Sequence, residues 1–133
     1  AKFAENFVNI GLVSDGGGTY FVGSRVGYHR AAEIFLAGKI LTAEDAHGLG
    51  LINHVVPPDK VASEALALAQ ALIQKAPCAL AAGKALLNLE SLPRLMACLE
   101  AETQTQRRMM ATEDAKEGMT AFLEKRTPNF LGK

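Results

Sequence analysis

The chain has 133 residues, 49% of them hydrophobic and 21% charged, and its 14 basic and 14 acidic residues give a formal net charge of zero. This is the composition of a single globular domain rather than of a disordered chain, and it offers no basic surface for nucleic acid. The longest apolar run is far shorter than the roughly 20 residues that span a bilayer, so neither a membrane segment nor a membrane partner is expected.

The first third of the chain predicts short elements around a glycine turn. Residues 7–13 mix β-branched, aromatic and aliphatic side chains, which favours a short buried strand or extended segment. Residues 14–19 then form the glycine turn, SDGGGT, and a helical turn is expected up to residue 21. Residues 27–38 predict a helix that ends at a left-handed glycine.

The next segment predicts a capped helix and a second strand. Thr42 is followed three residues later by Asp45, which is typical of a capping box. Residues 51–56 predict a brief strand, which Pro57 and Pro58 end. Because a sheet usually needs three or more strands to be stable, these two are expected to belong to a larger sheet.

The rest of the chain predicts helices only. Residues 60–75 are alanine-rich and amphipathic, and Pro77 begins a helix that runs to about residue 89. Apolar residues at helical spacing over 92–99 predict another helix, and Thr112 is a plausible cap for the last one.

The cysteines and histidines predict no metal or redox site. Cys78 and Cys98 lie in helical patterns without CxxC spacing, which indicates free thiols and a reducing compartment. His29, His47 and His54 are scattered, and their spacing matches neither a catalytic triad nor a set of metal ligands. No metal is therefore expected.

Four blocks of the sequence, in this order and with this spacing, resemble the enoyl-CoA hydratase/isomerase (crotonase) family. They are IGLVSDGGGT (10–19) with VG (26–27), FLAGKILTAEDA (35–46), GLGLIN (48–53) with VVP (55–57), and EDAKEGMTAFLEKR (113–126). The resemblance implies the α/β crotonase-like fold (the ClpP/crotonase spiral), of which this chain would be the mainly α-helical C-terminal part with about two short strands. Residues 1–56 would form the last turn of the spiral, including the glycine turn, and residues 57–133 the helical trimerisation region.

The same resemblance implies an enzyme of acyl-CoA metabolism, in fatty-acid or aromatic-acid degradation, located in the cytoplasm. Its substrate would be a coenzyme A thioester, with no separate cofactor, and its assembly a homo-oligomer, either a trimer or a dimer of trimers. Hydratases of the family carry a Pro-Glu pair where this chain has Asn6 and Phe7. Isomerases often lack that glutamate and carry one acid before the glycine turn, where Asp15 stands. Since one carboxylate can remove a proton and return it, an isomerase with Asp15 as catalytic residue and an enolate intermediate is favoured.

Other site residues follow from the same match. Gly16 and Gly17 would let substrate approach the backbone closely, and Phe7 and Tyr20 would help to bind it. Phe122 and Lys125 match residues that lie near coenzyme A in family members, often the coenzyme A of a neighbouring subunit, although core packing for Phe122 and a solvated lysine remain alternatives.

Several alternatives remain open at this stage. Asp15 could simply cap the helix that follows it. The glycines could bind phosphate, although neither GxGxxG nor a P-loop lysine is present. The activity could be that of a hydratase whose acid lies elsewhere. Without the oxyanion hole, which the resemblance assigns to the other half of the domain, the 133-residue chain alone would be an inactive oligomerising piece.

Overall fold

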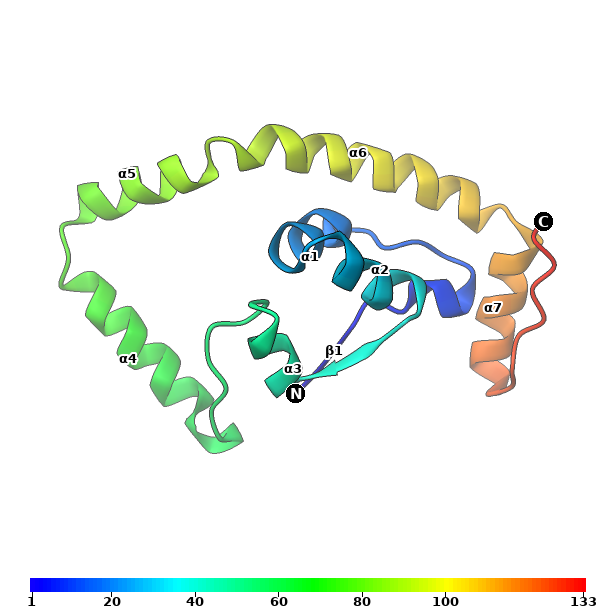
Figure 1. Ribbon diagram of the computed structural model, residues 1–133, viewed down its shortest axis with the longest axis horizontal. Coiled ribbons are helices and arrows are strands. Elements are labelled where there is room, and N and C mark those ends of the chain that lie inside the picture. Colours follow the sequence, from blue (N-terminus) through cyan, green and yellow to red (C-terminus); the bar gives the residue numbers. More distant parts are fainter.

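The computed structural model describes all 133 residues and contains two short strands, seven α-helices and two 3-10 helices (Figure 1). The first part of the chain forms β1 (Lys2–Ala4), η1 (Phe7–Ile10), α1 (Gly18–Val26), α2 (Tyr28–Leu36), β2 (Ile40–Thr42) and α3 (Ala43–Gly48). The second part forms η2 (Pro58–Lys60), α4 (Val61–Ile73), α5 (Pro77–Asn88), α6 (Ser91–Met110) and α7 (Glu113–Glu124).

The core of the chain is a small apolar cluster between the strands and the first two helices. β1 and β2 pair antiparallel, with Phe3 opposite Leu41. Val26, Ala31, Ile34 and Leu41 form the buried cluster, and Phe3 packs against it. Because a two-stranded ribbon is only marginally stable by itself, this contact with α1 and α2 is what holds the strands.

The helices of the second part form an open arc around this compact part (Figure 1). α4 makes its main contacts with η2 and α5 makes its main contacts with α6, and neither helix buries a residue. α6 then returns to contact α1, and α7 packs against η1. Only 11 of the 133 residues are buried, so much of the apolar surface is left uncovered.

No single helix is long and apolar enough to cross a bilayer. The segments Pro58–Ile73 and Pro77–Asn88 satisfy the length and hydropathy requirements only as a pair, and the pair is bent by 110°.

Both predicted strands are wrong in position. Residues 7–13 form η1 and an irregular link, because Gly11 turns the chain in a left-handed conformation with φ of 73°. Residues 51–56 contain no strand. η1 packs against α7 and not against a sheet, and strand propensity reports such half-buried surroundings more than a backbone preference.

The predicted helices are largely confirmed. Thr42 Oγ1 accepts a hydrogen bond from Asp45 N at 3.1 Å, and the Asp45 carboxylate accepts from Thr42 N at 3.0 Å, which completes the capping box. Thr112 Oγ1 accepts from Ala115 N at 3.1 Å and caps α7. The helical turn expected to end at residue 21 continues to Val26 as α1.

Candidate functional site

The glycine turn carries Asp15 between η1 and α1. Gly16 and Gly17 both have left-handed backbones, with φ of 63° and 86°, which glycine adopts without steric cost. Gly18 N donates to the carbonyl oxygen of Asp15 at 3.0 Å and closes the turn. A Cβ atom on Gly18 would overlap the Ser14 hydroxyl, so a larger residue would push the turn apart.

The start of α1 is capped by a side chain from α6 and not by Asp15. Glu102 is only 6% exposed, and its Oε2 accepts from Gly17 N at 2.7 Å. Its Oε1 accepts from Thr19 N at 3.0 Å and from the Thr19 hydroxyl. Helix starts leave such N–H groups unpaired, and the helix dipole also favours a carboxylate there. The interpretation of Asp15 as the helix cap is therefore wrong.

These contacts also weigh against phosphate binding at the glycine turn. Gly17 N and Thr19 N donate to Glu102, and Gly18 N donates to the Asp15 carbonyl. Three consecutive backbone donors at this helix start are thus already used. A phosphate would have to displace a buried carboxylate to reach them.

A second side chain of α6 holds the other flank of the glycine turn. Gln106 Oε1 accepts from Val13 N at 3.1 Å. Gln106 follows Glu102 by four residues, so both lie on the same face of α6. Ser14 is buried and donates to Glu5 Oε2 at 2.8 Å. The backbone is therefore anchored on both sides of Asp15.

Asp15 itself is exposed. Its carboxylate takes part in none of the chain's side-chain hydrogen bonds or ion pairs, and α1 has no side-chain cap from its own N-cap residue. The structure thus presents a carboxylate on a fixed backbone with an uncommitted side chain. Such a group can accept a proton and release it without first breaking another contact.

Phe7 and Phe122, which the sequence analysis assigned to different roles, lie at one site. Together with Asn6, Gly118 and Arg126 they line a hollow of about 340 Å³ between η1 and α7. Phe122 is 71% exposed and is therefore no part of the chain's core.

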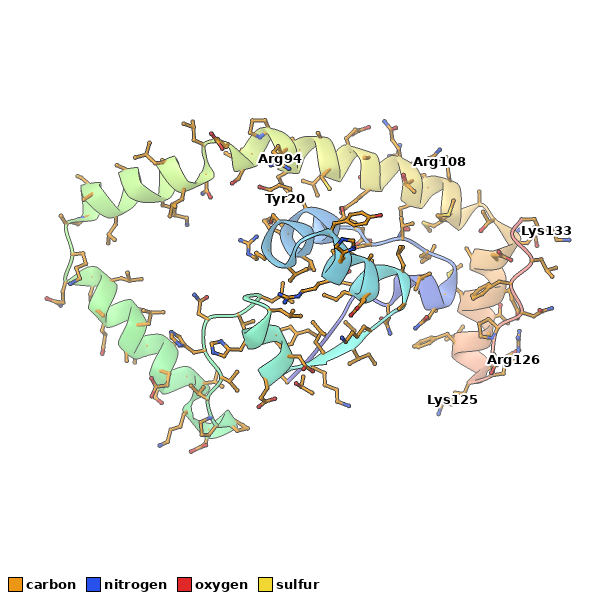
Figure 2. The ribbon with its side chains drawn as sticks, in the orientation of Figure 1. Tyr20, Arg94, Arg108, Lys125, Arg126 and Lys133 are labelled. Atoms are coloured by element: carbon orange, nitrogen blue, oxygen red, sulfur yellow. The ribbon has the colours of Figure 1, made fainter.

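Lys125 ends α7 in a left-handed conformation with φ of 56°, and it is the one non-glycine residue of the chain with a positive φ. Figure 2 shows it at the end of α7 that is farther from α6. Lys125 is exposed and directly precedes Arg126, which lines the hollow together with Phe7 and Phe122.

The remaining predicted substrate-binding residues lie with Asp15. Tyr20 is half-buried on α1, with its ring centroid 5.4 Å from that of Phe21, and Figure 2 shows it beneath α6. Gly16 is exposed and has open space around it, whereas Gly17 is buried against Leu95. The predicted site residues therefore form two groups, one on the glycine turn and α1 and the other on η1 and α7.

An ion-pair network borders the second group. Arg126 contacts Glu117 Oε1 at 2.5 Å and Glu124 Oε2 at 2.6 Å, and Asn129 N donates to Glu117 at 2.9 Å. The hydrogen bonds from Arg126 and then from Asn129 lower the pKa of Glu117 from 4.5 to about 2. The hydrogen bonds to Glu117 and Glu124 raise the pKa of Arg126. Arg126 and Glu117 are therefore both charged throughout the physiological range.

Glu102 and Gln106 were not predicted from the sequence as site residues. The available signal was a carboxylate on the apolar face of a helix, since Glu102 follows Leu95 and Cys98 at spacings of seven and four residues. Charged residues are almost never buried unless they are paired, so an acid at such a position indicates a specific partner.

The whole chain, residues 1–133, matches the model of the enoyl-CoA hydratase/isomerase family. Two relatives from Escherichia coli (strain K12), 2,3-dehydroadipyl-CoA hydratase and 1,2-epoxyphenylacetyl-CoA isomerase, are each 37% identical over 133 residues, which is all of this chain and 52% and 51% of theirs. The solved structure of an enoyl-CoA hydratase from Mycobacterium avium subsp. paratuberculosis K-10 matches with a TM-score of 0.92 and 34% identity, over 98% of this chain and 53% of that one. The chain thus spans about half the length of the relatives it matches.

Proposed function

Because the chain belongs to the enoyl-CoA hydratase/isomerase (crotonase) family, we propose that the protein shifts a double bond along an enoyl-CoA thioester, with Asp15 as the proton-transfer residue. The chain has part of the crotonase fold, as the sequence resemblance implied. The names of its relatives include both hydratases and isomerases, so the choice between these activities depends on the residues of this chain.

The uncommitted carboxylate of Asp15 is the observation that carries the proposal. A single residue that removes a proton at one carbon and returns it at another must be free to move between the two. Glu102 takes the helix-start donors that would otherwise hold Asp15 in place. Asp15 therefore combines a fixed backbone with an acid group that no other contact occupies.

The proposed reaction needs no oxidant, reductant or water. The Asp15 carboxylate takes a proton from the carbon between the thioester carbonyl and the double bond, and the C–H electron pair delocalises into the thioester as an enolate. The protonated carboxyl then returns the proton at the far end of the conjugated system, which leaves the double bond next to the carbonyl. Backbone donors must stabilise the enolate oxygen. We place them in the other half of the family's domain, as the resemblance implies, and the donors at the start of α1 are used by Glu102.

Phe7 supports isomerisation over hydration. Hydration requires a group that holds and activates water, and family hydratases are expected to have a glutamate at this position. Phe7 can neither accept nor donate a proton, and it lies half-buried in a hollow shared with Phe122. In the proposed complex Phe7, Tyr20 and Gly16 contact the acyl group, and Gly17 shapes the turn. Phe122 and Lys125 contact coenzyme A, which is the substrate's own carrier.

The proposal includes assembly of the protein into a homo-oligomer, either a trimer or a dimer of trimers, in the cytoplasm. The exposed apolar side chains of α4 and α5 support it, since uncovered apolar surface of this extent usually marks an interaction site. We assign this contact to residues 57–133. The two free cysteines are consistent with a reducing compartment.

The test uses the complete protein that carries these residues, with a 3-enoyl-CoA as substrate in deuterated water. Asp15→Asn is expected to lower both isomerisation and deuterium incorporation on the order of 100- to 10,000-fold, which is the usual contribution of a positioned acid or base. Asp59→Asn removes another exposed aspartate and is expected to leave both unchanged.

Equal deuterium incorporation in the protein and in Asp15→Asn would overturn this assignment. Hydration of crotonyl-CoA that survives in Asp15→Asn, together with absent isomerisation in the unsubstituted protein, would instead establish a hydratase whose acid lies elsewhere.

A further inference from the structure

α6 contacts the glycine turn on both sides of Asp15. Gln106 accepts from Val13, two residues before Asp15, and Glu102 accepts from Gly17, two residues after it. We propose that Glu102 and Gln106 are positioning residues that fix the backbone under Asp15 while keeping its carboxylate free. This inference rests on the proposed role of Asp15.

Glu102 is an unusual residue to find buried, since it has no cationic partner. A buried carboxylate is costly unless it is well hydrogen-bonded, and here two backbone N–H groups and the Thr19 hydroxyl donate to it. Cys98 Sγ, at 3.7 Å, adds a weak fourth contact. All of these donors except Cys98 belong to the start of α1, so Glu102 is placed specifically for that helix start.

Without Glu102, the nearest acid to these N–H groups in the sequence would be Asp15. It precedes Gly17 by two residues, and aspartate is one of the preferred residues for capping a helix start. A cap made by Asp15 would tie its carboxylate to α1 and hold it in the charged form. Glu102 therefore competes with Asp15 for the donors and keeps it available for proton transfer.

Gln106 and Leu95 complete the contact between α6 and the glycine turn. Gln106 fixes Val13 N, and a Cβ atom on Gly17 would lie 3.0 Å from Leu95 Cδ1, so the turn already touches α6 closely. The reacting groups of an enzyme must be placed within a fraction of an ångström, and a shift of about 1 Å can cost on the order of 100-fold in rate. A turn held at both flanks meets that requirement.

Glu100 provides a matched control on the same helix. It lies two residues before Glu102 and carries the same charge, but it is exposed and accepts only from Gln104 on its own helix, at 2.6 Å. Glu100→Gln thus makes the same chemical change without touching the glycine turn.

The experiment measures kcat and KM for isomerisation in the complete protein, with thermal unfolding as a check of folding. Glu102→Gln replaces one acceptor oxygen by an amide that opposes the N–H donors, so kcat is expected to fall on the order of 100-fold with KM within about twofold. Gln106→Leu is expected to lower kcat about tenfold, the usual effect of one lost hydrogen bond, whereas Gln106→Glu keeps the acceptor and is expected to retain activity. Glu100→Gln is expected to change neither constant.

Two further readouts separate positioning from simple structural support. In the Asp15→Asn background, Glu102→Gln should cause no further loss, because it acts through a group that is already removed. In Glu102→Gln with Asp15 intact, the acid limb of the pH–rate profile should move to lower pH, since N–H donors now favour the charged form of Asp15. A residue that only stabilises the fold would cause the same loss in both backgrounds and would leave the acid limb in place.

The outcomes separate this inference from the proposed function. Full activity of Asp15→Asn would overturn the proposed function and this inference with it. Loss of activity in Asp15→Asn, but unchanged kcat in Glu102→Gln, or equal losses in Gln106→Leu and Gln106→Glu, would overturn the inference alone. If Glu102→Gln does not fold, the two Gln106 variants decide the question.

Discussion

The compact part of the molecule and the arm formed by α4 and α5 (residues 61–88) differ in what keeps them folded. Ile34 of α2 is 3% exposed, whereas Ile73 of α4 is 73% exposed, although both are isoleucines in α-helices. The compact part is therefore held by burial of apolar side chains. The arm lacks such burial, and only the high helix propensity of its alanine- and leucine-rich sequence favours its helices.

This difference indicates which part of the chain lacks a partner. Helices shorter than about 12–15 residues are marginal in water unless they pack against something. α4 has 13 residues and α5 has 12, and their exposed apolar residues include Leu66, Leu68, Leu72, Ile73, Leu86 and Leu87. The oligomer proposed above would cover these side chains.

Replacement of Ile34 by alanine should reduce the stability of the protein most. It opens a cavity in the central apolar cluster and should lower the free energy of unfolding by about 3 kcal/mol. Ile73→Ala is the matched variant, and at low protein concentration it should lower it by less than about 0.5 kcal/mol. Urea unfolding followed by circular dichroism measures both values.

The same two variants also test whether the arm lies in a contact between copies of the chain. A cost of Ile73→Ala that grows with protein concentration would place the arm in a contact between copies of the chain, because association stabilises by mass action. Equal costs for Ile34→Ala and Ile73→Ala at the lowest concentration would contradict the division into a buried part and an uncovered arm.

Alanine substitutions at Gly118 and Gly83 test how closely their two helices are packed. A Cβ atom on Gly118 of α7 would overlap the backbone of Ile10 in η1, whereas one on Gly83 of α5 would meet open space. Gly118→Ala should therefore destabilise the protein by about 2 kcal/mol through overpacking. Gly83→Ala should stabilise it by about 0.5–1 kcal/mol, because alanine is the better helix former. Effects of the same sign would show that α7 can shift away from η1 at little cost.

The helices of both parts could be predicted from the sequence, because their signals are local. Pro77 at a helix start and the caps at Thr42 and Thr112 each involve residues within one turn of each other. The strands could not be placed. Residues 7–13 have the composition of a strand, but η1 packs against α7, more than a hundred residues later, and only the folded chain reveals that contact.

In the candidate site, too, the local features could be predicted from the sequence and the long-range contacts could not. Asp15 could be singled out because it directly precedes the three glycines. Whether its side chain is free could not be known, since the answer depends on Glu102, which is 87 positions away in the sequence. A local rule predicts that aspartate caps this helix, and a long-range contact overrides that rule.

The acid stability of the ion pair at the end of α7 should change least. The pKa of Glu117 is lowered from 4.5 to about 2, so the stability contributed by its pairing with Arg126 is present above about pH 4.5 and is lost as the pH falls toward 2. Glu117→Gln should therefore show a smaller fall in Tm between pH 6 and pH 3 than the unsubstituted protein. Because the pair is exposed, the difference should be modest and should shrink further in high salt.

Glu64→Gln on the arm is the matched control for this measurement. Glu64 lies on α4 and has no ion-pair partner, so its removal should leave the fall in Tm unchanged. If Glu64→Gln reduced that fall as much as Glu117→Gln does, the acid sensitivity would belong to the overall charge of the chain and not to the pair at the end of α7. α7 and the arm would then respond alike to pH, since neither would hold a carboxylate more firmly when folded than when unfolded.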